Sequence, residues 1–433
     1  MNIKQVIITR ILASLVLTAV LCLTAAMPAF AADGPISSGS DGQNAKAAIT
    51  TILKIAEGTD IPDSEFIFTL TRKAVAGVSV DAVEMPVIGP FAISYSAADT
   101  GKAKEAEDGV VRVPKELEIF GDVEWPHAGV YVYAVKETEG GDTQITYSAA
   151  QYDVYVYVAN KEDGSGLYMA GIGARIADND ESNKGADLNT KVDPAPGAGG
   201  GFEYSQIVFT NTYLKKYDEK DPAVEANWKL SAGKTVLGPY ADQTKYFDFE
   251  IDMKKPATLD GAASYRAYVV EMAGGIPKVV TDDANCPTIK ESTVFGNYIE
   301  VKAGTPVTVS LKHGQQLVFT GIHDGANYII TEKGAVDYTG SVVISESGSE
   351  NDVELFNDAS GEDRSTAPDD DMALRRFVND TGNTVSFHNQ YKEVSPMGIG
   401  IDSFPYAVVV AVAIAGLAVF MVFKYRRNTP YEK

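Results

Sequence analysis

The chain has 433 residues and a strong acidic excess, with 59 Asp and Glu against 37 Lys and Arg and a formal net charge of −22. Such a charge argues against nucleic-acid binding and favours solubility outside the cell. The length is sufficient for two domains of ordinary size. Of the two cysteines, only Cys286 lies beyond the amino-terminal apolar stretch, which excludes an intrachain disulfide once that stretch is removed.

The amino terminus has the pattern of a secretory signal peptide. Two basic residues precede an apolar stretch at residues 11–26, and Ala29-Phe30-Ala31 has the small-x-small form of a cleavage site. We therefore expect residues 1–31 to be a signal peptide, with a short linker over residues 32–44 after it.

The middle of the chain is rich in short alternating runs. Val, Ile, Tyr, Phe and Thr alternate with polar residues, and Gly, Asp, Asn and Pro separate one run from the next. The clearest runs are residues 66–70, 130–135, 152–158, 247–253 and 307–311. This pattern predicts an all-β chain with two tandem immunoglobulin-like or Greek-key β-sandwich domains, over residues 45–216 and 217–392.

Each predicted domain contains a lysine, a glutamate and an asparagine in the same order. They are Lys54, Glu137 and Asn211 in the first domain, and Lys234, Glu332 and Asn389 in the second. The lysine and the asparagine lie 157 positions apart in one domain and 155 in the other. We interpret the two halves as a divergent internal duplication.

Strand periodicity places these polar residues among apolar ones. Alternate residues of a strand share a face, so Asn211 shares its face with Phe209 and Tyr213, and Asn389 is flanked in the same way. A buried polar group without a partner is costly, and a Lys–Glu–Asn cluster in each core would satisfy all three groups. The alternative is an edge lysine, a solvated glutamate and a turn asparagine in each domain.

Such a cluster is expected to form an amide bond within itself. Desolvation lowers the pKa of the lysine and leaves a neutral amine, and it raises the pKa of the glutamate, whose acid form can polarise the asparagine carbonyl. The amine then attacks the side-chain amide, ammonia leaves, and an isopeptide bond remains. In the second domain Lys229 competes with Lys234 for the role of the amine.

The carboxyl terminus begins with the five residues Val394, Ser395, Pro396, Met397 and Gly398. An apolar run over residues 404–423 follows, long enough to cross a bilayer as a helix, and the basic tail after it should stay cytoplasmic. This order resembles a Gram-positive cell-wall sorting signal, with Met397 where Thr is usual. The resemblance implies that residues 393–433 direct sortase cleavage after Met397, and an ordinary one-span anchor is the alternative.

The stretch from Gly129 to Lys161 resembles the streptococcal major-pilin family, because its Gly-Val-Tyr, Ile-Thr-Tyr and Val-Tyr-Val-Ala-Asn-Lys segments match the family pattern closely. The resemblance implies one Lys–Asn isopeptide bond per domain, promoted by a glutamate, and the two sets named above are the matching residues. One departure concerns the first domain. Related first domains often read Ile-Thr-Lys where this chain has Ile49-Thr50-Thr51, and Lys54 lies three residues later.

The same resemblance implies covalent polymerisation. In such pilins a sortase joins the cleaved motif of one subunit to a surface lysine of the next. Lys191, in the segment leading to the first domain's final strand, is the candidate, and Lys184 is the runner-up. For either residue the alternative is an ordinary solvated lysine.

Together these patterns predict the structural backbone subunit of a sortase-polymerised pilus, secreted to the cell surface through a membrane-anchored precursor. The implied partners are a sortase, identical subunits, minor pilins, peptidoglycan and a host-surface ligand. We expect no cofactor, no metal site and no enzymatic turnover beyond the self-catalysed bonds. One alternative is a wall-anchored adhesin of the same fold that is never polymerised. An anchored enzyme is the other, and no catalytic constellation in the sequence favours it.

Overall fold

A computed structural model describes most of the region between the two predicted targeting segments. The described residues are 35–75, 85–121, 123–197, 203–224, 228–292, 294–346, 353–357, 361–367 and 375–391. The predicted signal peptide, the five-residue sorting motif and the predicted membrane span lie outside these ranges. Within them, no helix is long and apolar enough to cross a membrane.

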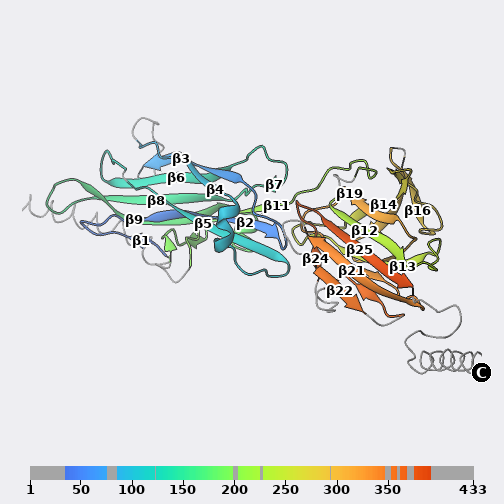
Figure 1. The fold of residues 1–433 in the computed structure, drawn as a ribbon. Coiled ribbons are helices and arrows are strands. Elements are labelled where there is room, and N and C mark those ends of the chain that lie inside the picture. Colours follow the sequence, from blue (N-terminus) through green and yellow to red (C-terminus); the bar gives the residue numbers. More distant parts are fainter. Residues whose placement is uncertain are drawn as a thin grey trace, which may run out of the picture.

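The first domain is built from two sheets and a hydrophobic core that includes residues from Ala45 to Tyr213 (Figure 1). The larger sheet has the order β1 (Ser37–Ser38), β9 (Leu167–Asp178), β8 (Gln151–Asn160), β6 (Gly129–Thr138), β3 (Ser64–Val75) and β4 (Phe91–Tyr95), with β10 (Lys191–Val192) beside β9. The smaller sheet has the order β5 (Val110–Ile119), β2 (Ala47–Ala56), β11 (Val208–Tyr213) and β7 (Ile145–Thr146). Two short 3-10 helices, η1 (Ala97–Lys102) and η2 (Glu181–Asn183), lie in the connections.

The second domain also has two sheets around its own core, which includes residues from Leu230 to Phe387. Its larger sheet has the order β16 (Ile289–Ser292), β17 (Gly296–Lys302), β14 (Ser264–Ala273), β19 (Gln315–Thr320), β12 (Leu230–Leu237), β25 (Asn383–Tyr391), β21 (Tyr338–Glu346) and β22 (Val353–Asn357), with β15 (Ile276–Val279) beside β14. Its smaller sheet has the order β18 (Val307–Leu311), β13 (Phe247–Lys254), β20 (Asn327–Glu332) and β23 (Arg364–Ser365), with β24 (Arg376–Phe377) beside β20. The prediction of an all-β chain of sandwich domains is confirmed.

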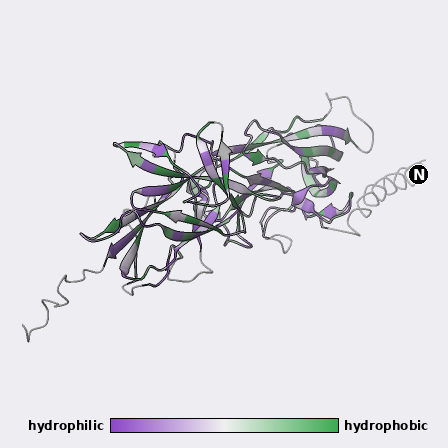
Figure 2. Cartoon of the chain, turned by 90° about the vertical axis from the view of Figure 1, so that its right-hand side faces the viewer, coloured by the Kyte–Doolittle hydropathy of each residue, from purple (hydrophilic) through white to green (hydrophobic). Residues whose placement is uncertain are grey.

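The alternation seen in the sequence corresponds to alternating burial. Along β13, buried Phe247, Phe249, Ile251 and Met253 are separated by residues with more exposed side chains, as a strand with one face on the core requires. Figure 2 shows hydrophobic and hydrophilic residues side by side along many strands of both domains. The first and last long strands of each domain, β2 with β11 and β12 with β25, pair in parallel. This parallel pair places residues from the two ends of a domain next to each other.

The two domains are in direct contact at the connection after β11. The backbone N–H of Asp324 donates to the carbonyl of Lys215 at 3.0 Å, and the Lys215 side chain forms an ion pair with Asp380. Gly325 lies so close to the end of β2 that a Cβ there would be 2.6 Å from Cβ of Ala56. Backbone hydrogen bonding and close packing therefore join the second domain to the first.

Asp324 makes this joint sensitive to pH. Burial, with repulsion from Asp380, raises the pKa of Asp324 to about 6, and its Oδ1 has no hydrogen-bond partner in the described part of the chain. The raised pKa means that the ionised carboxylate costs stability above about pH 6, and that this cost disappears as the pH falls toward the unfolded value near 4. We expect Asp324→Asn to raise the free energy of unfolding by about 1–3 kcal/mol at neutral pH and to leave it unchanged near pH 3.5.

Denaturant unfolding of the two proteins across this pH range measures the effect. The matched control is Asp218→Asn, which removes an exposed carboxylate from the same connection. An equal change in stability at both ends of the pH range would contradict the prediction.

Candidate cross-linking sites

The second domain brings its predicted lysine, glutamate and asparagine together. Lys234 on β12 and Asn389 on β25 lie on neighbouring parallel strands, where Asn389 is opposite Val236, two residues after the lysine. Glu332, at the end of β20, comes from the facing sheet. Their exposed fractions are 1% for Lys234 and 0% for both Glu332 and Asn389. The fold thus encloses the three polar groups in an apolar core.

Glu332 is the hydrogen-bonding centre of this cluster. Its Oε1 accepts from Lys234 Nζ at 2.6 Å and from Asn389 Nδ2 at 2.7 Å. The Lys234 ammonium also lies 4.4 Å from the centroid of the Phe247 ring. Burial lowers the pKa of Lys234 to about 8, although the charge of Glu332 opposes the shift. At neutral pH a much larger fraction of Lys234 is therefore the neutral amine than for a lysine in solvent.

Two further residues complete the site, and the sequence analysis missed both. Arg364 on β23 is opposite Glu332 in the register and almost fully buried, and its charge contributes to lowering the pKa of Lys234. Gly340 on β21 is opposite Asn389, and a Cβ there would lie 2.1 Å from Arg364 Nε and 2.6 Å from Asn389 Oδ1. Only glycine leaves room for the amide and the guanidinium together.

The first domain has a related cluster around Asn211. The Asn211 Nδ2 donates to Glu137 Oε2 at 3.0 Å and to Thr51 Oγ1 at 3.3 Å, and its Oδ1 accepts from the backbone N–H of Ser148 at 2.9 Å. Glu137 comes from β6 on the facing sheet, and desolvation raises its pKa to about 7. The asparagine and the acid are therefore positioned as they are in the second domain.

The structure does not bring Lys54 to this cluster, which corrects the predicted set for the first domain. Lys54 Nζ forms an ion pair with Glu181 Oε1 at 3.3 Å, at the surface. Asn211 is opposite Leu53 in the parallel register, and the residue two positions earlier is Thr51, fully buried. Thr51 in the first domain thus takes the place that Lys234 has in the second.

The alternative lysines lie elsewhere. Lys229, the competitor of Lys234, donates to the backbone carbonyl of Asp380 and lies 4.8 Å from the Tyr217 ring, at the joint between the domains. Lys191 is half-buried on β10, opposite Arg175 of β9.

Lys184, the runner-up polymerising residue, comes directly after η2. Its side chain is 80% exposed, with Nζ 3.7 Å from Glu181 Oε2. Of the two candidate lysines for joining subunits, Lys184 is the more accessible.

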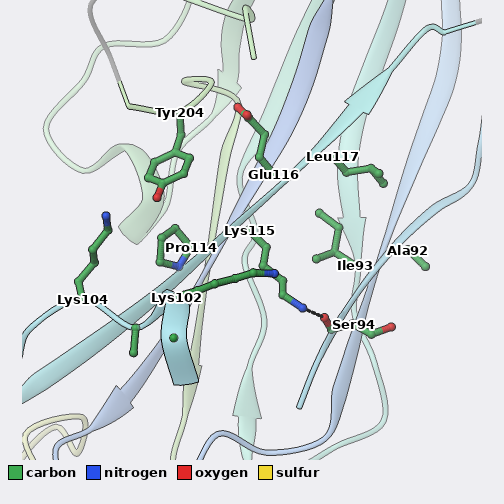
Figure 3. Close-up of a pocket in the computed structure, with 12 residues that line it drawn as sticks. Ala92, Ile93, Ser94, Lys102, Lys104, Pro114, Lys115, Glu116, Leu117 and Tyr204 are labelled. Atoms are coloured by element: carbon green, nitrogen blue, oxygen red, sulfur yellow. Dashed lines mark hydrogen bonds between the residues drawn. The ribbon is translucent and has the colours of Figure 1, made fainter. Parts of the chain in front are cut away.

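A surface groove of about 700 Å³ lies between the edge strands β4 and β5 of the first domain (Figure 3). Lys115 reaches across it to the backbone of Ser94, while Lys104 and Tyr204 lie at its other end. The lysines are neutralised by acids: Lys115 pairs with Asp99 at 2.7 Å and Lys104 with Glu203 at 2.5 Å. Both lysines of this groove are therefore held in ion pairs with acidic side chains.

Comparison with known families matches each domain separately. Residues 50–214 match the model of the Spy0128-like isopeptide containing domain. Residues 229–389 match a model described only as a domain of unknown function, DUF7601. Residues 50–214 are therefore similar to a Spy0128-like isopeptide containing domain, and the match includes Thr51, Glu137 and Asn211.

Individual relatives are pilus proteins. A curated relative, the pilus tip adhesin Cpa of Streptococcus pyogenes, is 29% identical over 185 residues, which is 43% of this chain and 20% of the relative, so the chain spans about a fifth of that protein's length. Among solved structures, a major pilin of Streptococcus pyogenes aligns over 81% of this chain and 99% of its own, with 18% identity and a TM-score of 0.31. A second major pilin, T3.2 of the same organism, aligns over 83% of this chain and 100% of its own, with 18% identity and a TM-score of 0.30.

Proposed function

We propose that this chain is the backbone subunit of a surface pilus that a sortase polymerises, and that an isopeptide bond between Lys234 and Asn389 stabilises its second domain. The observation that carries the proposal is the enclosed cluster of Lys234, Glu332 and Asn389, in which one carboxyl oxygen contacts both the amine and the amide. The match of residues 50–214 to an isopeptide-containing domain supports it.

The geometry suggests how the bond forms. The neutral amine of Lys234 attacks Cγ of Asn389 while the acid form of Glu332 donates a proton to the amide. A new N–C bond replaces the bond to Nδ2, the proton released by the amine passes through Glu332 to the departing nitrogen, and ammonia leaves. The fold holds all three groups in contact, which supplies the orientation that a reaction in solution lacks. The product replaces a buried ion pair with a neutral amide.

Polymerisation is the part of the proposal that concerns partners. A sortase would cleave after Met397 and join that residue to a lysine of an identical subunit, with peptidoglycan as the final acceptor and minor pilins as additional subunits. A second candidate function, a wall-anchored adhesin that is not polymerised, is favoured by the match to the pilus tip adhesin Cpa. The two functions differ in whether subunits become joined to one another.

Production of the full chain with a pilus sortase tests the difference. We expect a ladder of covalent multimers in a denaturing gel, which Pro396→Ala abolishes because the sorting motif is lost. Lys184→Ala and Lys191→Ala are compared, and we expect one of them to remove the ladder while the monomer remains folded. Lys220→Ala is the control, because it removes an exposed lysine from the connection between the two domains. Wall-anchored monomer without any ladder in the unmodified protein would instead support the adhesin.

A further inference from the structure

The first domain contains the acid and the amide of a cross-linking site but has threonine in the place of the lysine. In both domains the acid comes from the facing sheet, and the asparagine lies on the last strand of the domain. In both, the residue two positions before the asparagine's parallel partner faces the amide: Lys234 in one domain and Thr51 in the other. Thr51 brings a hydroxyl, which is also a nucleophile for acyl transfer.

The contacts of Asn211 bring together the groups that an acyl transfer to Thr51 would use. Its amide nitrogen, the leaving group, lies within hydrogen-bond distance of both the Thr51 hydroxyl and the Glu137 carboxyl. Its carbonyl oxygen accepts from the backbone N–H of Ser148 at 2.9 Å, and a donor in this position stabilises the oxyanion that forms during attack. By contrast, Asn389 Oδ1 in the second domain has no hydrogen-bond partner in the described part of the chain.

Glu137 is suited to move the proton. Its Oε2 contacts the amide, while its Oε1 is buried and has no hydrogen-bond partner among the described residues. Desolvation raises the pKa of Glu137 to about 7, so both its acid and base forms are present near neutral pH. One side chain can therefore accept the hydroxyl proton and deliver a proton to the departing nitrogen.

We propose that Thr51 and Asn211 form an intramolecular ester bond that joins the first and last strands of the first domain. The bond between Thr51 Oγ1 and Asn211 Cγ forms as the bond between Cγ and Nδ2 breaks. The hydroxyl proton passes through Glu137 to that nitrogen, which leaves as ammonia, so atoms and charge balance without any further reactant. Because the Nδ2–H···Oγ1 hydrogen bond lies close to the plane of the amide, the amide turns about its Cβ–Cγ bond before attack.

The surroundings give ammonia a way out. A groove of about 590 Å³ at the surface includes Glu137, Ser148 and Tyr147 in its lining, so the acid lies between the buried amide and solvent. Thr51 and Asn211 are themselves fully buried, which shields the product from water. Ammonia that escapes is protonated and diluted outside the cell, and this removal favours the ester. Like the isopeptide bond of the proposed function, this ester would join the first long strand of a domain to an asparagine on its last strand. It depends on a separate set of residues.

The test uses the unmodified full chain, purified from the producing cell and digested with a protease. We expect one peptide pair linked through Thr51 and Asn211, lighter by one ammonia than the sum of its parts. Hydroxylamine at mildly alkaline pH should separate the pair and leave a hydroxamate on Asn211, because hydroxylamine cleaves esters and leaves amides intact. The Lys234–Asn389 pair in the same digest should resist the treatment, so each domain gives its own result.

Three variants complete the experiment. Thr51→Val keeps the branched shape without the hydroxyl and should abolish the first-domain link, while Thr50→Val, at the adjacent buried threonine, should retain it. Thr51→Lys should produce a link through Asn211 that hydroxylamine does not cleave.

Release of the Thr51 and Asn211 peptides as separate species at their sequence masses would overturn the ester. A hydroxylamine-resistant link through Asn211 in the unmodified chain would also overturn it. If only the Lys234–Asn389 link is missing from the digest, this would count against the isopeptide bond of the proposed function. The first-domain link would still test the ester on its own.

Discussion

Glu332→Gln is expected to raise the mass of the protein by that of one ammonia, beyond the change of side chain, because the second-domain bond does not form. The glutamine keeps the shape of Glu332 but cannot relay a proton between the amine and the amide. Lys234 is also left in an apolar core without its counter-charge. The residues joined lie 155 positions apart, and the lost cross-link alone should cost about 4–5 kcal/mol of stability by analogy with a disulfide.

Intact mass and thermal unfolding measure the two effects together. Glu250→Gln is the matched control, because it makes the same change in the smaller sheet of the same domain, where Glu250 pairs with Lys333 near the surface. We expect this control to keep the wild-type mass deficit and unfolding temperature. A Glu332→Gln protein that still lacks one ammonia at the Lys234–Asn389 peptide would show that the carboxyl is not required.

Gly340→Ala is expected to reduce the yield of the same bond and to destabilise the second domain. The added methyl group would lie 2.6 Å from Asn389 Oδ1 and 2.1 Å from Arg364 Nε, both of which are buried. Neither group can move into solvent, so the amide must turn away from Lys234 or β21 must shift. Overpacking of this kind costs roughly 1–3 kcal/mol, and the stabilisation from the bond is lost in addition.

The mass of the linked peptide pair gives the yield, and thermal unfolding gives the stability. Gly171→Ala is the control, since that glycine also lies within a strand but its added Cβ would be 3.5 Å from the nearest atom, an ordinary contact. A Gly340→Ala protein with full cross-link yield and unchanged unfolding temperature would show that the site tolerates a side chain there.

The second-domain cluster could be predicted because its residues lie on strands with a clear alternation. In β25, buried Val385, Phe387 and Asn389 alternate with more exposed residues, so the sequence itself places the asparagine on the inner face. The choice between Lys229 and Lys234 needed the structure, because the strand begins only at Leu230. Once that start is known, the alternation of β12 places Lys234 inside.

The sequence did not show that threonine replaces the lysine in the first domain, because the two faces of β2 are almost equally buried. Nearly all of its residues are buried, and Thr50, on the face opposite to Thr51, donates to the backbone carbonyl of Ser205 in the connection before β11. Lys54 lies an odd number of positions after Thr51, so it points away from the face that meets Asn211. The parallel register, with Asn211 opposite Leu53, is a tertiary fact that local pattern does not contain.

The supporting residues were missed for a related reason. Arg364 lies on a two-residue strand, and Ser148 contributes a backbone N–H from a segment outside the strands. Neither position shows a periodic pattern, and a backbone donor has no signature in the sequence. Their roles depend on which segments the fold brings to the asparagine, which only the assembled sandwich determines.

Parallel pairing of the first and last strands also decides how tension would pass through the second domain. The chain enters at the start of β12 and leaves at the end of β25, so pulling on its two ends loads their ladder in shear. Eight residue pairs, from Leu230–Asn383 to Leu237–Gln390, would then resist sliding at the same time. A covalent bond between Lys234 and Asn389 would shorten the load path further. Force would pass directly from one strand to the other, and the rest of the sandwich between them would carry almost none of it.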